Sequence, residues 1–196
     1  MIRRFSAPTP DLPTLVLSSL CLCLPTSSAM GEQTPLFDPN GYRIDGFRSP
    51  VPNTVPGAAT VTTRDVDQLL KTSPAIPVLV DVLPSPPKPK GLAPTSLWLP
   101  PARHNIPGSV WLPNVGYGRL SDQLDRYFRV NLERLTSGDK NRPIVIYCLE
   151  DCWMSWNAAR RAAEYGYSRV LWYPDGTDGW EFAGHPLESS TPAPME

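Results

Sequence analysis

Short apolar runs alternate with amphipathic stretches through the middle of the chain, and this alternation predicts both strands and helices. Apolar runs bounded by prolines or turn residues occupy residues 76–82, 144–147 and 170–173, and a weaker run lies within residues 105–112. Runs of this length and composition are typical of strands whose two faces are both buried, as in parallel sheets. The pattern therefore predicts a mostly parallel central sheet.

Apolar residues at helical spacing predict three helices between and around these strands. One helix is expected at residues 64–71, capped by Thr62 or Thr63, and a second at residues 121–135, capped by its first serine. The third is an alanine-rich segment that ends at Gly166, a residue suited to close a helix. Strand, helix and strand in this order form βαβ units, so we predict an α/β fold with helices on both faces of the sheet.

Prolines divide the chain into regions. The chain has 25 prolines among 196 residues, and the segment 114–173 holds only one of them. Proline lacks an N–H donor and is excluded from helix interiors and central strands. We therefore expect an extended arm at residues 30–57 and a proline-rich insertion at residues 83–101 within a domain spanning residues 58–187. Residues 188–196 are expected to form a disordered tail.

The first 29 residues are expected to be a signal peptide. Two arginines near the start precede an apolar run at residues 12–24, which is followed by small residues at 26–29. A run of about 13 residues is shorter than a membrane span, which needs about 20, and fits a secretory signal. The alternative is a buried element of the domain. Export predicts a periplasmic protein with no membrane span after signal removal, whose remaining cysteines are Cys148 and Cys152.

The charge balance narrows the classes of partner. The 18 lysines and arginines nearly equal the 19 aspartates and glutamates, and charged residues make up only 19 % of the chain. A nucleic-acid binder normally carries a basic field, and an acidic interaction tail carries a block of carboxylates. The composition shows neither feature, so we expect no nucleic-acid partner.

Cys148 and Cys152 stand at the end of the strand predicted at residues 144–147 and at the start of the helix that follows. Ligands bind at this edge of a parallel sheet, and a helix amino terminus lowers the pKa of a thiol. A disulfide between residues four apart would add little stability, which favours a chemical role. A thiolate beside a resolving cysteine is the layout of dithiol redox chemistry. The alternative is that Cys148 is a small buried residue at a strand end.

Other cysteine chemistries fit less well. Haem attachment needs a histidine directly after the second cysteine, and none is present. A zinc site would need His104 and His185, at a spacing that matches no common site. Where a cysteine phosphatase would need a phosphate-clamping arginine, the chain has Trp153, Met154 and Ser155. We therefore expect no haem or metal cofactor, and the two thiols remain available for a Cys148–Cys152 disulfide.

The order of these elements, together with six short motifs, resembles the rhodanese domain over roughly residues 58–187. The motifs are, in chain order, Asp81, Ile106-Pro-Gly-Ser109, Tyr147-Cys148, Ala158-Ala159, Gly166-Tyr167 and Gly179-Trp180. The resemblance implies a rhodanese-like fold in which Cys148 carries sulfane sulfur as a persulfide, and an activity of the thiosulfate sulfurtransferase type if the chain is catalytic.

The segment from Cys148 to Ala159 also looks like exported rhodanese-like proteins named for a CxxCW motif, although three residues separate the cysteines here. Those proteins are associated with pyrroloquinoline-quinone (PQQ)-dependent alcohol catabolism. The resemblance implies a sulfur-transfer or thiol-redox role. The partner would be a small sulfur or thiol substrate, or a periplasmic protein of quinoprotein alcohol oxidation.

The candidate site has Cys148 as the attacking thiol and Cys152 as the resolving thiol. The other candidate residues of the loop and pocket are Leu149, Glu150, Asp151, Trp153, Met154, Ser155, Asp81 and Trp180. The resemblance places Trp153 and Leu83 where rhodaneses usually carry cations. Glu150 and Asp151 add negative charge that raises a thiol pKa and disfavours thiosulfate.

Two questions stay open from the sequence. Asp81 either orients the loop by accepting its N–H groups or caps a turn. The chain is either a sulfur carrier or a non-catalytic binding module. In the second case four tryptophans would rim a pocket for a small organic ligand, a quinone cofactor or a partner protein. These are Trp153, Trp156, Trp172 and Trp180, although for any single one of them ordinary core packing is the expected role. The insertion is expected to shape partner access, because it follows the strand that carries Asp81.

Overall fold

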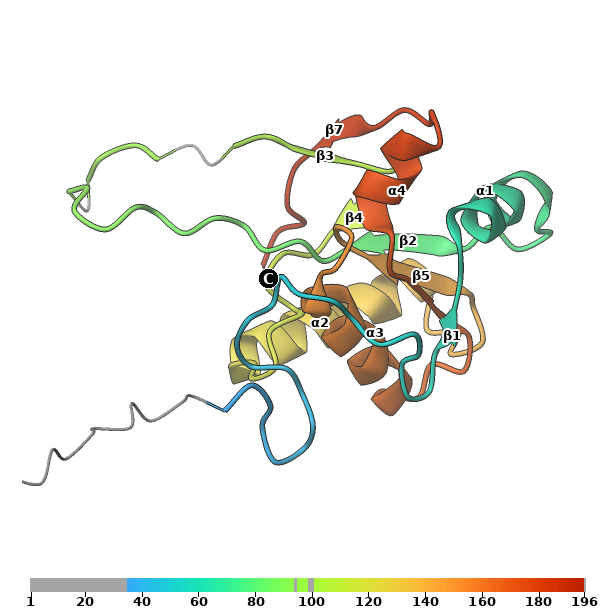
Figure 1. Ribbon diagram of the computed structural model, residues 1–196, viewed down its shortest axis with the longest axis horizontal. Helices are drawn as coiled ribbons and strands as arrows, with labels where there is room; N and C mark the ends of the chain where they lie inside the picture. Colours follow the sequence, from blue (N-terminus) through green and yellow to red (C-terminus); the bar gives the residue numbers. More distant parts are fainter. Residues whose placement is uncertain (1–34, 94, 99–100, 196) are drawn as a thin grey trace, which may run out of the picture. The chain divides into compact units, whose positions relative to one another are not determined.

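The computed structural model describes residues 35–93, 95–98 and 101–195. Five strands form one sheet in the order β1-β6-β5-β2-β4, and every neighbouring pair is parallel (Figure 1). The strands are β1 (Ala59–Thr60), β2 (Val78–Asp81), β4 (Val110–Trp111), β5 (Ile144–Tyr147) and β6 (Val170–Tyr173). A separate antiparallel pair consists of β3 (Arg103–Asn105) and β7 (Glu188–Ser190). The parallel central sheet is as the sequence predicts.

Helices cover both faces of this sheet, which confirms the predicted α/β class. Helices α2 (Asp122–Thr136) and α3 (Trp153–Glu164) lie on one face, and α1 (Thr63–Thr72) and α4 (Gly176–Phe182) lie on the other (Figure 1). The strand side chains divide accordingly: in β5, Ile144 and Ile146 join the core on the α2–α3 side, and Val145 and Tyr147 join the core on the opposite side. Burial of both faces explains why the central strands are continuously apolar.

The predicted helices begin where their caps indicate. The Thr62 hydroxyl accepts a hydrogen bond from the Asp65 backbone N–H at the start of α1, and the Asp65 carboxylate accepts one from the Thr62 N–H. Ser121 caps α2 through the N–H of Leu124. These side chains satisfy N–H groups that the first turn of a helix leaves free.

Three segments differ from the expectations. The two residues of β1 were not expected as a strand, because so short a segment carries no readable periodicity. Residues 176–182, which are not among the three predicted helices, form α4; its two glycines give low helix propensity, and the Trp180 ring packs in the core. The expected disordered tail includes β7, whose backbone pairs with β3.

Residues 35–57 form an extended arm without helix or named strand, and it lies on the outer side of α3. The Asn157 side chain, fully buried in α3, accepts a hydrogen bond from the Arg43 N–H at 3.0 Å and donates one to the Arg43 carbonyl at 2.9 Å. The Trp156 indole N–H donates to the carbonyl of Thr54 at 2.9 Å. The expected signal peptide lies outside the described residues. No helix among the described residues is long and apolar enough to cross a membrane.

The proline-rich insertion leaves the sheet at Leu83, directly after β2, and returns at β3 (Figure 1). Its described residues form neither helix nor strand. The Trp111 indole N–H donates to the Leu83 carbonyl at 2.7 Å and fixes the point where the insertion departs. Because β2 and β5 are parallel and Asp81 pairs with Tyr147, the insertion departs at the edge of the sheet where Cys148 lies.

Candidate functional site

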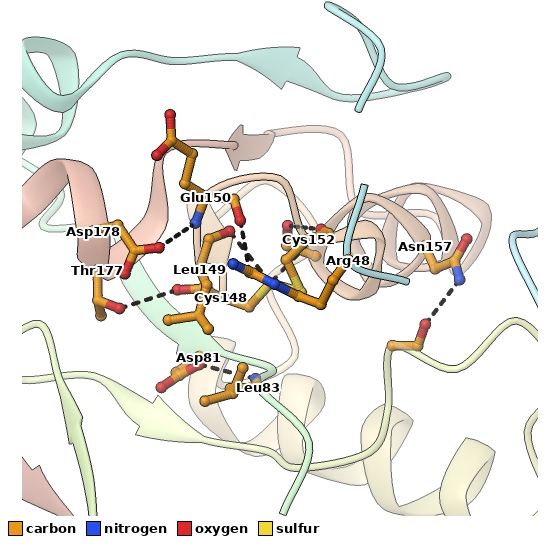
Figure 2. The surroundings of a disulfide bond; sticks show 12 residues. Arg48, Asp81, Leu83, Cys148, Leu149, Glu150, Cys152, Asn157, Thr177 and Asp178 are labelled. Atoms are coloured by element: carbon orange, nitrogen blue, oxygen red, sulfur yellow. Dashed lines mark hydrogen bonds between the residues drawn. A yellow bond between two sulfur atoms is a disulfide. The ribbon is translucent and has the colours of Figure 1, made fainter. Parts of the chain in front are cut away.

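The two cysteines enclose a tight loop between β5 and α3. Cys148 follows the last residue of β5, and Cys152 is the N-cap residue of α3. The structure joins them in a disulfide with a Cα–Cα distance of 6.5 Å, and their exposed fractions are 0 % and 2 % (Figure 2). The sequence placed both thiols at this edge, and the structure brings them into direct bonding contact.

The first half of the loop is held by α4. The carbonyl of Cys148 accepts a hydrogen bond from the Thr177 N–H at 3.1 Å. The Glu150 N–H donates to the Asp178 carboxylate at 3.1 Å (Figure 2). Gly176 has a φ of +54°, and a Cβ there would lie 2.5 Å from the Cys148 carbonyl oxygen. Only glycine therefore permits this close approach of α4 to the loop.

The second half of the loop is held by the arm. The Trp153 N–H donates to the Phe47 carbonyl at 2.9 Å, and the Ser49 N–H donates to the Asp151 carbonyl at 3.1 Å. The Arg48 guanidinium donates to the Glu150 carbonyl at 2.6 Å (Figure 2). None of these arm residues was among the site residues predicted from sequence, because backbone pairing over about 100 positions leaves no motif.

Asp81 is fully buried beside the loop, and its carboxylate makes two contacts. Its carboxylate accepts a hydrogen bond from the Leu83 N–H at 2.9 Å, which caps the turn after β2, and forms an ion pair with Arg103 at 2.6 Å. The Arg103 guanidinium also donates to the Thr177 hydroxyl at 3.4 Å. Asp81 is therefore linked to the loop only indirectly, through Arg103 and Thr177. Burial raises the pKa of the Asp81 carboxyl, and the Arg103 guanidinium opposes that rise.

The outer surface of the loop is acidic. Glu150 and Asp151 are exposed, and together with Asp175 they line a groove beside the loop. A second groove contains Leu149 and Thr177. Negative side chains beside a thiol disfavour its anionic form and repel an anionic sulfur donor.

The tryptophans do not form the aromatic rim expected for a binding pocket. All four rings are buried, with exposed fractions from 0 % to 7 %, and each indole N–H donates to an oxygen of this chain. The acceptors belong to Ser49 and Pro50 for Trp153, Thr54 for Trp156, Ser155 for Trp172 and Pro186 for Trp180. The expectation of a rim is therefore wrong, because these rings build the core and hold the arm.

The remaining predicted site residues fall into two places. Met154 and Ser155 are buried in the first turn of α3, where the Ser155 hydroxyl donates to the Cys152 carbonyl at 3.0 Å. Trp180 belongs to the core on the opposite face of the sheet from Cys148 and Cys152. Trp180 therefore supports α4 and does not line the site.

Metal binding has no support in the described part of the chain. No group of three or more histidine, cysteine, aspartate or glutamate side chains there could hold a metal ion.

A buried cysteine pair at the carboxyl edge of a parallel sheet, at the start of a helix, defines a class of α/β proteins that handle sulfur on a loop cysteine. The family model of the rhodanese-like domain matches residues 62–183. The chain belongs to the rhodanese-like family, whose members include sulfurtransferases.

Individual relatives are distant. The thiosulfate sulfurtransferase GlpE of Actinobacillus pleuropneumoniae serotype 5b is 30% identical over 79 residues, which are 40% of this chain and 59% of that protein. The chain thus spans about three fifths of the curated relatives that it matches.

Two solved structures are similar to this chain at low sequence identity. The polysulfide-sulfur transferase homodimer from Wolinella succinogenes is 18% identical, with a TM-score of 0.42, over 67% of this chain and 79% of that one. Thiosulfate sulfurtransferase from Pseudomonas aeruginosa is 16% identical, with a TM-score of 0.45, over 69% of this chain and 21% of that one.

Proposed function

We propose that this protein is a two-cysteine sulfur carrier in which Cys148 accepts sulfane sulfur and Cys152 releases it. The observation that carries the proposal is the Cys148–Cys152 disulfide at the start of α3. A resolving thiol within bonding distance of the loop cysteine makes internal attack possible, whereas a single-cysteine carrier has to wait for an external acceptor.

The chemistry takes two steps. The Cys148 thiolate attacks the outer sulfur of a persulfide donor, the donor leaves as its thiolate, and a persulfide remains on Cys148. The Cys152 thiolate then attacks the Cys148 sulfur, hydrosulfide leaves, and the Cys148–Cys152 disulfide forms. A mixed disulfide on Cys148 would be resolved in the same way, with a thiolate as leaving group. An external dithiol restores both thiols, so the buried disulfide is the oxidised end of the cycle.

The acidic loop surface supports an uncharged or protein-borne persulfide donor over inorganic thiosulfate. Glu150 and Asp151 repel a dianion, and Asp178 adds a third carboxylate at the loop backbone. A thiosulfate sulfurtransferase activity of the kind named for GlpE is therefore proposed here only as a secondary reaction.

The test is mass spectrometry of the Cys148 peptide after treatment with a small organic persulfide. Cys152→Ser should accumulate a persulfide on Cys148, whereas the wild-type chain should release hydrosulfide and form the disulfide. Cys148→Ser is the matched control and should do neither. Absence of added sulfur on Cys148 in Cys152→Ser would exclude the carrier. Retained binding of a quinone by Cys148→Ser would then favour the non-catalytic binding module.

The compartment is also a proposal. The apolar run at residues 12–24 and the basic residues before it support export to the periplasm, where the disulfide would persist. Fractionation of cells that express the full chain tests this, since the mature form should appear in the periplasmic fraction.

The metabolic setting is proposed from the CxxCW resemblance alone. It suggests a partner among periplasmic proteins of PQQ-dependent alcohol oxidation. Deletion of the gene should then impair growth on an alcohol that requires a quinoprotein dehydrogenase and leave growth on sugars unchanged.

A further inference from the structure

The arm segment Phe47–Ser49 lies along the loop that joins the two cysteines. Its backbone pairs with the loop on both sides of Arg48, and Arg48 and Cys152 form an antiparallel bridge. The arm therefore serves as an added edge of the Cys148–Cys152 loop, held by the same kind of hydrogen bonds as a strand.

The Arg48 side chain turns back over this loop. Its guanidinium donates to the carbonyl of Glu150 at 2.6 Å, midway between the two cysteines in sequence, and Figure 2 shows the side chain extended across the loop. The acceptor is a neutral oxygen, so this contact leaves the charge of Arg48 unneutralised.

The side chains around the loop are mostly acidic, so a nearby cation changes the electrostatics at Cys148. Glu150 and Asp151 stand in the loop, and Asp175 and Asp178 come from the start of α4. Four carboxylates at this edge oppose the formation of a thiolate on Cys148.

Two other arginines near the loop make their hydrogen bonds elsewhere. Arg103 forms its ion pair with the buried Asp81 carboxylate at 2.6 Å. The Arg43 guanidinium donates to the Asp45 and Gly46 carbonyls and lies 5.0 Å from the centre of the Trp153 ring. Within the described part of the chain, Arg48 is thus the cation whose side chain hydrogen-bonds to the loop backbone.

We propose that Arg48 is a positioning residue of the sulfur site, which holds the loop closed and supplies the positive charge that stabilises the Cys148 thiolate and its persulfide. Stabilisation of a persulfide by Arg48 rests on the proposed sulfur-carrier function. Stabilisation of the Cys148 thiolate by Arg48 does not, so the role of Arg48 and the carrier function can be tested separately.

The experiment measures the pH dependence of Cys148 alkylation by iodoacetamide, resolved to the Cys148 peptide by mass spectrometry, in the full chain carrying Cys152→Ser. Arg48→Gln should raise the pH midpoint and slow alkylation near neutral pH roughly three- to tenfold, since one nearby cation has been lost. Arg48→Lys should restore the midpoint at least in part, because it restores the charge.

Tyr42→Phe serves as the matched control. The Tyr42 hydroxyl donates to Glu164 at 2.5 Å and anchors the arm away from the loop, so its loss weakens the arm without changing any charge. The midpoint should stay where it is in this variant. An unchanged midpoint in Arg48→Gln, or an equal shift in Tyr42→Phe, would overturn the proposal.

Persulfide capture on Cys148 is measured in the same variants. A shifted midpoint without any captured sulfur would refute the carrier function and leave the role of Arg48 standing. Captured sulfur with an unshifted midpoint would do the reverse.

Discussion

Replacing Asn157 by alanine should detach the arm and weaken the whole domain. This side chain is fully buried in α3 and makes three hydrogen bonds to backbone groups: from the Arg43 N–H at 3.0 Å, to the Arg43 carbonyl at 2.9 Å and to the Gly116 carbonyl at 2.9 Å. This one side chain therefore hydrogen-bonds α3 both to the arm and to the segment before α2.

The magnitude follows from what the substitution leaves behind. Each buried backbone group that loses its partner costs about 1–3 kcal/mol, and water entering the vacated space recovers part of that cost. For three groups we expect a loss of about 3–5 kcal/mol in the free energy of unfolding, which is a large share of the roughly 5–15 kcal/mol of an ordinary domain.

The assay is urea unfolding of the oxidised protein followed by tryptophan fluorescence, paired with limited trypsin digestion at Arg43 and Arg48. Asn157→Ala should lower the unfolding midpoint and speed cleavage in the arm. Asn40→Ala is the control: this exposed residue of the same arm should change stability by no more than about 0.5 kcal/mol. A loss under about 1 kcal/mol in Asn157→Ala, with unchanged cleavage, would refute the view that this side chain anchors the arm.

Two further predictions follow from the site and its surroundings. Gly176→Ala places a Cβ 2.5 Å from the Cys148 carbonyl oxygen at a φ of +54°. It should lower the free energy of unfolding by about 2–4 kcal/mol in the same urea assay and slow sulfur loading. Gly138→Ala is the control: its φ is +76° but the space around it is open, so it should cost only about 1–2 kcal/mol. Partial burial acts to raise the pKa of Asp125, but the hydrogen bond from Tyr165 and a neighbouring arginine hold it below its ordinary value of 3.8. The folded carboxyl thus releases its proton at lower pH than the unfolded one. Its contribution to stability is complete above the unfolded pKa and is lost as the pH falls through the folded pKa. Acid titration of stability should be shallower in Asp125→Asn, and an identical slope would contradict this reading.

The central strands and their helices could be predicted because burial of both sheet faces leaves a strong signal. The runs at residues 144–147 and 170–173 contain only apolar and aromatic side chains, and β5 and β6 have these same bounds. The caps of α1 and α2 were readable because threonine and serine side chains compete for the free N–H groups of a first turn.

The sequence left the role of the tryptophans open between core packing and a ligand site for a physical reason. An indole ring serves equally in a core and at a ligand site, and the sequence does not tell which oxygen receives its N–H. In the structure the acceptors for Trp153 and Trp156 are arm residues more than 100 positions upstream. The sequence shows aromatic residues near the cysteines. Whether they pack in the core or line a site depends on where the arm lies, and the arm sequence has no periodic pattern that predicts its position.

The arm gives the proline excess a structural meaning that bears on the site. A proline has no N–H to satisfy but keeps its carbonyl, and the Pro50 carbonyl accepts a hydrogen bond from the Trp153 indole. An extended segment of this kind can lie across a helix start and offer acceptors without competing for the N–H groups of α3. The Trp153 backbone N–H, which the first turn of α3 leaves without a partner inside the helix, donates to the Phe47 carbonyl. Because the arm occupies this N–H, the start of α3 has one donor fewer to stabilise an anion. The positive charge of Arg48 therefore matters more here than in a loop whose N–H groups are all free to bind the anion.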